Sequence, residues 1–197
     1  MAPTAEPRKL LPAAERLESI ELAAARAFCR TGFSATSMAD VALEAGVTKV
    51  LVYRHVNGKA GLYRSILERV STTLRSEFTA ALAADAPDPA TTAHLTTARL
   101  DPDGYRLLFG HAEREPEFAD YAGEIMAIIV DVADMAFGSH IAPHLRKWAT
   151  ELTFRWLVQS ILTWLEHGDP AHDDEFVTHT SAGLTALVAQ LTGASPR

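Results

Sequence analysis

Apolar residues recur along this chain at the spacing of amphipathic helices. Five of them follow the pattern i, i+3, i+4, i+7, i+8 and predict a first helix that begins near Pro12 and ends before Gly32: Ile20, Ala23, Ala24, Ala27 and Phe28. A second set steps by four and predicts a long helix from Lys59 to about Ala84: Leu62, Ile66, Val70, Leu74 and Phe78. One side of that long helix is therefore apolar along its length.

Prolines and glycines divide the remainder of the chain into further helices. The motif at residues 86–89 (APDP) ends the long helix, and the motif at residues 101–104 (DPDG) has the composition of a turn. The helices predicted here cover residues 90–100, about two turns that carry Tyr105, and residues 116–138, 144–167 and 173–191. The sequence has no sustained period-two alternation and no hairpin dipeptide between β-branched runs. We therefore predict an all-α fold of about nine helices.

Residues 34–62 carry the signals of two short helices joined by a tight turn. Ser37 is a suitable N-cap for the first helix, and Asp40 stands three residues later, as in a capping box. Gly46 suits the turn because glycine tolerates backbone conformations that other residues avoid. Thr48 is a suitable N-cap for the second helix. Together these signals predict a helix-turn-helix.

The second short helix has one apolar side and one side that is suited to contact DNA. With Val52 facing inward, the opposite stripe carries a cation, an apolar group, an aromatic ring and a second cation: Lys49, Val50, Tyr53 and Arg54. A recognition helix uses such groups to contact base edges and phosphates in the major groove. The pattern therefore predicts a DNA recognition helix.

The same stretch resembles the tetracycline-repressor family of bacterial transcription regulators. The matching pattern runs from Ala24 to Leu62 and reads A-x-x-x-F, G-F-x-x-T-S, D-V-A, A-G-V-T-K, Y-x-H and K-x-x-L. These spacings together are specific, because a generic helix-turn-helix shares only the glycine and the apolar positions. The resemblance covers only about the first third of the chain. It implies a homodimeric regulator, a repressor, that binds a double-stranded DNA operator and is released from it by a small-molecule effector.

The resemblance places ten side chains at the predicted DNA surface: Thr36, Ser37, Thr48, Lys49, Val50, Leu51, Tyr53, Arg54, His55 and Lys59. Lysine can donate to guanine, aliphatic groups can pack on a thymine methyl, and tyrosine, arginine and lysine can reach phosphates. His55 is either a contact or a half-buried packing residue. Val50 and Ala60 stand where the family usually has a small residue and an acid, so no operator sequence can be transferred.

For the C-terminal part, the resemblance implies an effector cavity among the middle helices and a dimer interface formed by the last two helices. Nine candidate cavity residues combine apolar walls with a few polar groups: Leu74, Phe78, His94, Tyr105, Phe109, Met126, Ile129, Trp156 and Gln159. Each of these side chains alone also fits an ordinary core. Ala182, Gly183 and Ala186 permit a close approach of helices at an interface.

Charge is distributed unevenly along the chain, whose formal net charge is −7. Residues 1–70 contain ten Lys and Arg against seven Asp and Glu, a balance of +3. Residues 71–197 contain eight against eighteen, a balance of −10. A slightly basic N-terminal part can bind phosphates on an acidic chain, because contact depends on the local surface. Arg8 and Lys9 either add to such a contact or belong to a solvated tail.

We find no sequence pattern of an enzyme, a cofactor site or a metal centre. The chain has no G-x-S-x-G nucleophile motif, no P-loop and no dinucleotide-binding glycine pattern, and its histidines lack metal-ligand spacing. The single cysteine, Cys29, is either a small buried hydrophobe or a redox-sensitive thiol. The apolar run at residues 126–130 is stopped by Asp131 and is too short to span a membrane. We expect a soluble cytoplasmic protein.

These observations predict three segments: a flexible arm at 1–12, a DNA-binding domain at 13–58 and an effector-binding and dimerisation domain at 59–197. The predicted function is a ligand-controlled transcription regulator with no catalytic role. Two alternatives remain open. One is a helical small-molecule carrier or enzyme whose N-terminal domain is only structural. The other is an activator or nucleoid-type protein without effector control.

Overall fold

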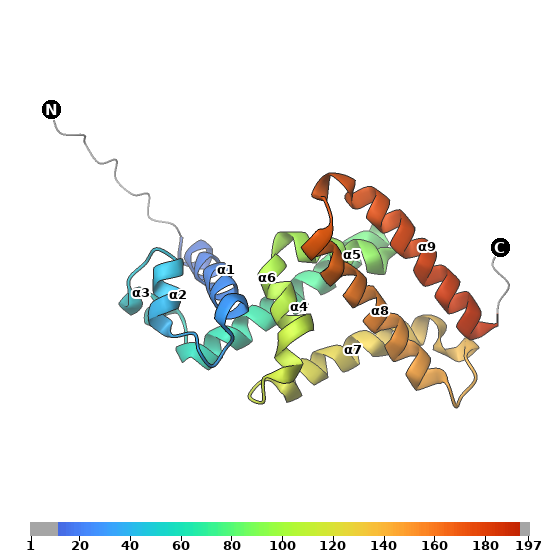
Figure 1. Cartoon of the computed structure of the whole chain (residues 1–197), viewed down its shortest axis with the longest axis horizontal. Coiled ribbons are helices and arrows are strands. Elements are labelled where there is room, and N and C mark those ends of the chain that lie inside the picture. The colour runs from blue at the N-terminus through green and yellow to red at the C-terminus, as the bar shows by residue number, and fades with distance from the viewer. Residues whose placement is uncertain (1–11, 194–197) are drawn as a thin grey trace. The chain divides into compact units, whose positions relative to one another are not determined.

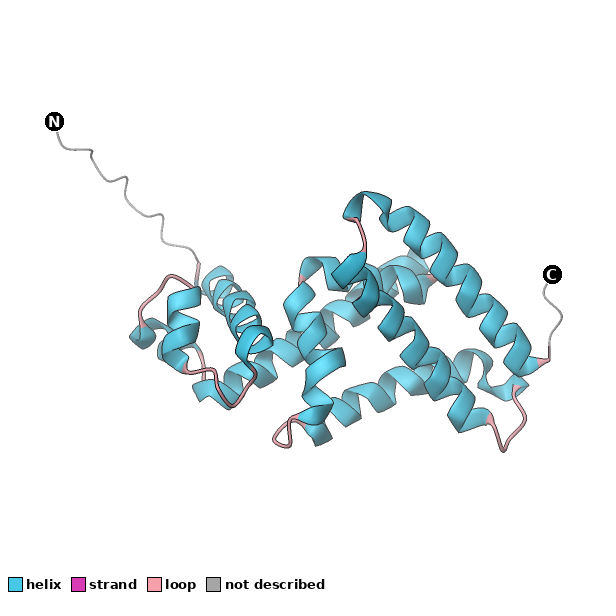
Figure 2. Ribbon diagram, viewed as in Figure 1, coloured by secondary structure: helices cyan, strands magenta, loops and turns pink. Residues whose placement is uncertain are grey.

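The computed structural model describes residues 12–193, and all regular structure within this range is helical (Figure 2). Nine α-helices follow one another along the described residues, with short 3₁₀ and π segments between some of them. The predicted all-α fold is confirmed. The predicted arm lies outside the described residues except for residue 12, and so do the predictions for Arg8 and Lys9. None of the described helices is both long enough and apolar enough to cross a membrane.

The chain divides into two compact units at a boundary between Ser65 and Ile66. We call the described residues 12–65 the head and residues 66–193 the body. The boundary falls inside helix α4 (Gly58–Ala83), whereas the sequence predicted a boundary just before that helix. The difference arises because the first turns of α4 contribute buried side chains to the core of the head.

Three short or medium helices precede α4 in the head: α1 (Ala13–Thr31), α2 (Met38–Glu44) and α3 (Lys49–His55) (Figure 1). The N-cap signals explain where the two short helices begin. The hydroxyl of Ser37 accepts from the backbone N–H groups of Ala39 and Asp40, and the Asp40 carboxylate accepts from the N–H of Ser37 at 2.8 Å. The predicted capping box is therefore confirmed.

The turn between α2 and α3 has the geometry that its sequence requires. Gly46 has a φ of 64°, a left-handed conformation that glycine adopts without steric cost. The hydroxyl of Thr48 then accepts from the N–H of Leu51 at 3.3 Å and caps α3, as predicted. Glu44, the last residue of α2, accepts from Arg26 and Arg30 of α1. Hydrogen bonds from the two arginines lower the pKa of the Glu44 carboxyl, and the bond from Arg26 has the larger effect.

Three aromatic rings form the centre of the head. Phe28 comes from α1, Phe33 from the following loop and Tyr63 from α4, and their centroids lie 5.2 to 5.9 Å apart. Edge-to-face and tilted arrangements of this kind are favoured by the ring quadrupoles. Val41 of α2 and Val52 of α3 are fully buried in the same unit. The apolar sides of all four helices thus meet in one core.

Lys59 fastens the loop between α1 and α2 to the start of α4. Its Nζ donates to the backbone oxygens of Phe33 at 2.8 Å and Ser34 at 3.2 Å. The same ammonium group lies 4.4 Å from the centroid of the Phe33 ring, within the range of a cation–π interaction. One side chain therefore donates hydrogen bonds to two loop carbonyls and also contacts an aromatic ring.

The body contains the rest of α4 and five further α-helices: α5 (Pro89–Leu100), α6 (Pro102–Arg106), α7 (Ala119–Phe137), α8 (Arg146–His167) and α9 (Asp173–Thr192). A π-helix at Leu107–His111 continues α6, and 3₁₀ segments cover Ala112–Arg114, Gly138–His140 and Pro170–His172. The ends of α5, α8 and α9 lie within two residues of their predicted positions. Helix α7 begins three residues later than predicted, after Pro116.

The prediction of a turn at residues 101–104 is wrong. This segment is the start of α6, with Asp101 as N-cap and Pro102 in the first turn. The Asp101 carboxylate accepts from the N–H of Gly104 at 3.0 Å and from Nη2 of Arg69 at 2.7 Å. Aspartate followed by proline occurs both in turns and at helix starts, and the ion pair to α4 favours the helix start here.

The core of the body lies where α5, α6, α8 and α9 pack together. Its buried cluster consists of Leu95, Ala98, Tyr105, Leu157 and Ile161. At one edge of this cluster, Asp173 at the start of α9 accepts from both Nε and Nη2 of Arg99 on α5, at 2.9 and 2.7 Å. It also accepts from Nε1 of Trp164 on α8 at 2.7 Å. One carboxylate therefore ties three helices together, and Arg99 is the main cause of its lowered pKa.

We expect Lys59→Met to lower the free energy of unfolding by about 2 kcal/mol, because a hydrogen bond to a charged group typically contributes about 1.5–3 kcal/mol. Methionine keeps most of the aliphatic stem and removes the donor. Thermal and urea unfolding followed by circular dichroism measure the change. Lys49→Met is the matched control, since Lys49 is exposed on α3. Equal stability of both variants would contradict the fastening function of Lys59.

Candidate nucleic-acid interface and ligand cavity

Helix α3 presents a mixed cationic, apolar and aromatic surface. Val52 is fully buried in the head, which turns the opposite side of the helix outward. On that side Val50 is 71% exposed and Tyr53 is 50% exposed, and the flanking Lys49 and Arg54 are exposed as well. The Nζ of Lys49 lies 5.7 Å from the centroid of the Tyr53 ring. The four side chains of the predicted stripe therefore lie on one accessible surface.

Other predicted DNA-binding residues surround this surface. Ser37 and Thr48 are exposed, and each hydroxyl already accepts the capping hydrogen bond of its helix. A hydroxyl that caps a helix can still donate its proton, so both groups remain able to contact phosphate. Leu51 and His55 are partly exposed. Both interpretations of His55 therefore stay predictions.

Thr36 and Lys59 have partners inside the head. Thr36 is 2% exposed, and its hydroxyl lies 2.7 Å from the oxygen of Gly32 and 2.7 Å from the hydroxyl of Thr31. Lys59 is held by the loop carbonyls described above. The sequence analysis did not predict the internal contacts of Lys59, because its partners lie 25 and 26 residues away. Their predicted contacts with DNA stay predictions.

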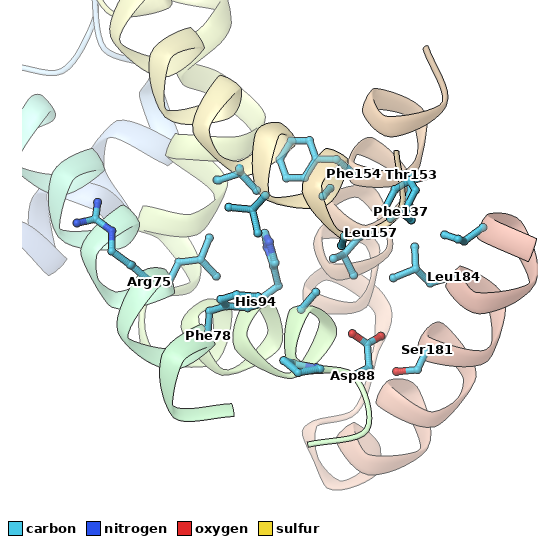
Figure 3. Close-up of a pocket in the computed structure, with 18 of the residues that line it drawn as sticks. Arg75, Phe78, Asp88, His94, Phe137, Thr153, Phe154, Leu157, Ser181 and Leu184 are labelled. Carbon is cyan, nitrogen blue, oxygen red and sulfur yellow. The ribbon is translucent and has the colours of Figure 1, made fainter. Parts of the chain in front are cut away.

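The body contains a partly open cavity of about 520 Å³, bounded by α4, α5, α7, α8 and α9 (Figure 3). Most of its wall is aliphatic or aromatic, and these residues include Leu74, Phe78, Ile125, Ile129, Val132, Phe137, Phe154, Leu157 and Leu184. The polar and charged residues of the wall are Ser71, Arg75, Asp88, His94, Thr153, Ser181 and Thr185. A mainly apolar cavity of this volume with a few polar groups is typical of small-molecule sites.

His94 and Tyr105 form a buried polar pair beside the cavity. His94 lines the cavity wall, and its Nδ1 lies 2.8 Å from the hydroxyl oxygen of Tyr105. Burial lowers the pKa of His94 to about 4, so the imidazole is neutral at pH 7. Burial also raises the pKa of Tyr105 well above its ordinary value. Both groups are therefore uncharged hydrogen-bonding partners.

The structure brings together only part of the predicted cavity set. Leu74, Phe78, His94 and Ile129 line the cavity. Tyr105 and Phe109 pack behind His94, with ring centroids 6.0 and 5.5 Å from the imidazole. Trp156 and Gln159 line a second, shallower hollow between α8 and α9, and Met126 lines neither. The ligand contacts of these residues stay predictions.

The cavity wall also contains residues that the sequence analysis missed. On α8 the missed residues are Thr153, Phe154 and Leu157, which stand three or four positions apart and could have been found by that spacing. The same helix also carries large aromatic side chains away from the cavity, and one of them, Trp148, is 56% exposed. Asp88 and Ser181 carry no pattern that would have assigned them to a cavity.

Helix α9 has small residues on two different sides. Ala182 and Ala186 are exposed, four residues apart on the outer surface of the helix. Gly183 instead faces α8, because a Cβ at this position would lie 2.9 Å from the Trp156 ring. The close helix approach predicted at Gly183 therefore occurs within one chain, whereas the two alanines lie on an accessible surface.

Comparison with known proteins supports the two-part organisation. A model of the family described as bacterial regulatory proteins, tetR family, matches residues 21–66. The HTH-type transcriptional activator FasR of Mycolicibacterium smegmatis is 33% identical over 104 residues, which cover 50% of this chain and 48% of that protein. The match therefore spans about half the length of this relative.

Solved structures are similar over nearly the whole chain. A transcriptional regulator of Aquifex aeolicus covers 87% of this chain and 99% of its own, with a TM-score of 0.67 and 17% identity. The transcriptional regulator FadR of Bacillus subtilis, solved in complex with stearoyl-CoA, covers 91% and 99%, with a TM-score of 0.60 and 12% identity. At these identities the likeness shows a shared fold. The head therefore matches the DNA-binding part of the tetR family of bacterial regulatory proteins, and the chain shares its helical fold with the solved regulators.

Proposed function

We propose that this chain is a DNA-binding transcription regulator that acts as a homodimer and is released from its operator by a small molecule. The observation that carries the proposal is the outward surface of α3, where Lys49, Val50, Tyr53 and Arg54 are accessible on a rigidly capped helix. These side chains combine donors for base edges and phosphates with an apolar group for a thymine methyl.

Electrostatics support DNA as the partner of the head. Residues 1–70 have a positive balance of formal charge although the whole chain has a net charge of −7. Glu44, an acid at the end of α2, is engaged by two arginines of α1. Because these ion pairs compensate its charge, the Glu44 carboxylate repels a DNA phosphate less than an unpaired carboxylate would. Affinity for DNA should fall steeply with salt, as is general for phosphate contacts.

The outer surface of α9 supports a dimer. Ala182 and Ala186 allow a second helix to approach closely, as small residues do in helical bundles. Exposed apolar side chains on α8, such as Trp148 and Leu152, can extend the interface. A dimer also suits the function, because two recognition helices must enter major grooves about 34 Å apart.

The cavity of the body supports control by a small molecule. Its volume of about 520 Å³ lies in the range typical of ligand sites, and its wall is mainly apolar. The Bacillus subtilis protein of the same fold binds stearoyl-CoA, a ligand with a long apolar chain. We propose that ligand binding in this chain favours a conformation of α4 that alters the distance between the two heads of the dimer. Coupling of this kind requires that the ligand prefer one of two conformations.

Substitutions on α3 should separate phosphate contacts from base contacts. Arg54→Gln should weaken binding to all DNA and lower the salt slope by about 1, because one phosphate contact is lost. Lys49→Ala should cost about 1–3 kcal/mol on the preferred operator and relax the preference at one base pair. Fluorescence anisotropy with the DNA upstream of the gene, excess competitor DNA and two salt concentrations measures both effects. Unchanged affinity in both variants would refute the head as a DNA reader.

Changing the outer surface of α9 should disrupt the dimer. The double variant Ala182→Glu, Ala186→Glu should be monomeric in light scattering and should bind a two-half-site operator at least tenfold more weakly, because one head alone must hold the DNA. The control is Ala127→Glu, which is exposed on α7 and lies outside the proposed α8 and α9 interface. A double variant that stays dimeric, with wild-type operator affinity, would place the interface elsewhere.

A further inference from the structure

The polar pair beside the cavity determines which hydrogen-bonding group the protein offers to a ligand. The side chain of Tyr105 is fully buried, and among the described residues its hydroxyl has one hydrogen-bond partner, Nδ1 of His94 at 2.8 Å. A buried O–H that donates to nothing costs about 1–3 kcal/mol. The phenol therefore donates its proton, and Nδ1 is the acceptor.

The imidazole proton must then reside on the other nitrogen. In a neutral imidazole one ring nitrogen is a donor and the other an acceptor. His94 is neutral at pH 7 because burial lowers its pKa to about 4. Since Nδ1 accepts from Tyr105, Nε2 carries the hydrogen. Tyr105, which lies behind the cavity wall, thus determines the tautomer of the His94 imidazole and leaves Nε2–H as its donor.

The Nε2–H group is available to a ligand. No described residue accepts a hydrogen bond from Nε2. This atom is also absent from the fully buried polar atoms that lack a partner, so it is accessible. His94 lines the cavity, so the cavity is the space to which Nε2 is open. In Figure 3 the His94 ring lies between the residues of α4 and those of α8. A ligand in the cavity therefore meets an N–H donor in an otherwise apolar wall.

A second polar group of the wall lacks a partner. Ser181 on α9 lines the same cavity, and its Oγ is buried without a hydrogen-bond partner among the described residues. Buried polar atoms in native proteins are usually satisfied, so an exception beside a cavity points to a missing ligand or water. Ser181 is independent of the His94 pair, because the two residues belong to different helices.

The charges of the wall disfavour an anionic ligand. Asp88 accepts from the N–H of Thr91 at 3.1 Å and from its hydroxyl at 2.6 Å, and so caps α5 as an anion. Arg75 is the only cation among the described lining residues; it is exposed, and in Figure 3 its guanidinium points away from His94. A carboxylate deep in the cavity would lose its hydration without gaining a cationic partner.

We propose that the molecule which controls this protein is uncharged and mainly apolar, and that it carries a hydrogen-bond acceptor, such as a ketone or ester carbonyl, for Nε2–H of His94. Ser181 provides a second hydrogen bond from the opposite side of the cavity. This inference rests on the proposed function, because it specifies the ligand class of the cavity through which that function is controlled. It assigns His94 as the residue that determines specificity.

Benzophenone and diphenylmethane test the acceptor, because they have the same two rings and differ by a carbonyl in place of a methylene. Isothermal titration calorimetry on the full chain should show that benzophenone binds about tenfold more tightly, which corresponds to one hydrogen bond in an apolar site. The anion 4-benzoylbenzoate should bind at least tenfold more weakly than benzophenone. Equal binding of the first two, or tighter binding of the anion, would overturn the inference.

Variants of His94 locate the effect. His94→Phe should bind benzophenone and diphenylmethane equally, whereas His94→Gln, whose amide can place a donor near the position of Nε2, should keep part of the difference. His144→Phe, an exposed histidine outside the cavity, is the control and should behave as the wild type. If His94→Phe does not fold, illumination of bound benzophenone in the wild type, followed by peptide mass spectrometry, should label peptides that contain Phe154 or Leu157. Labelling elsewhere would contradict the site.

The outcomes also separate this inference from the proposed function. The probe experiments contain no DNA. Equal affinity for benzophenone and diphenylmethane would therefore refute the ligand class and leave the proposal of DNA binding by the head unchanged. Conversely, a chain that ignores promoter DNA but prefers benzophenone through His94 would refute the regulator and retain the ligand class. That second result would favour a carrier of uncharged apolar molecules.

Discussion

The length of the recognition helix constrains the whole head. Helix α3 has seven residues, and an isolated helix of that length does not form in water because nucleation costs more than a few hydrogen bonds return. Its shape therefore depends on the fully buried Val52, on the Thr48 cap and on the left-handed Gly46 before it. Because these inward and terminal groups hold the helix, its outward side chains need not contribute to folding. They are therefore available for the proposed contacts with DNA.

The body combines a packed region with a hollow one. The cluster of Leu95, Ala98, Tyr105, Leu157 and Ile161 provides ordinary core packing, whereas the neighbouring apolar wall encloses empty volume. Leu157 belongs to both, so the cavity is continuous with the core. Unfilled apolar volume forfeits dispersion contacts, which a ligand of matching shape restores. Occupation of this cavity by the proposed ligand would therefore be favourable without a strong charge.

Local signals made the head predictable, and the absence of such signals limited the body. Ser37, Asp40, Gly46 and Thr48 act within a few residues of their position, so sequence spacing located α2 and α3. The internal partners of Lys59 and the ion pair from Arg69 to Asp101 join residues at least 25 positions apart, and no pattern in the chain reveals them. Helix α8 has apolar residues on more than one side, and periodicity alone could not tell which side encloses the cavity. The widened π-turn at Leu107–His111 likewise has no distinct composition.

The carboxylate of Asp173 fixes the N-terminal end of α9, one of the helices that bound the cavity, to two other helices. It joins α5, α8 and α9 at the first residue of α9, and the Trp164 and Phe176 rings stack beside it with centroids 4.9 Å apart. Val188, which also lines the cavity, lies fifteen residues further along α9, about 22 Å away at the rise of an α-helix. If the proposed ligand is bulky, α9 would pivot about Asp173, and its C-terminal end would be displaced most. Ala182 and Ala186 lie on the part of α9 beyond this pivot, so the proposed dimer surface would tilt with the volume of the ligand.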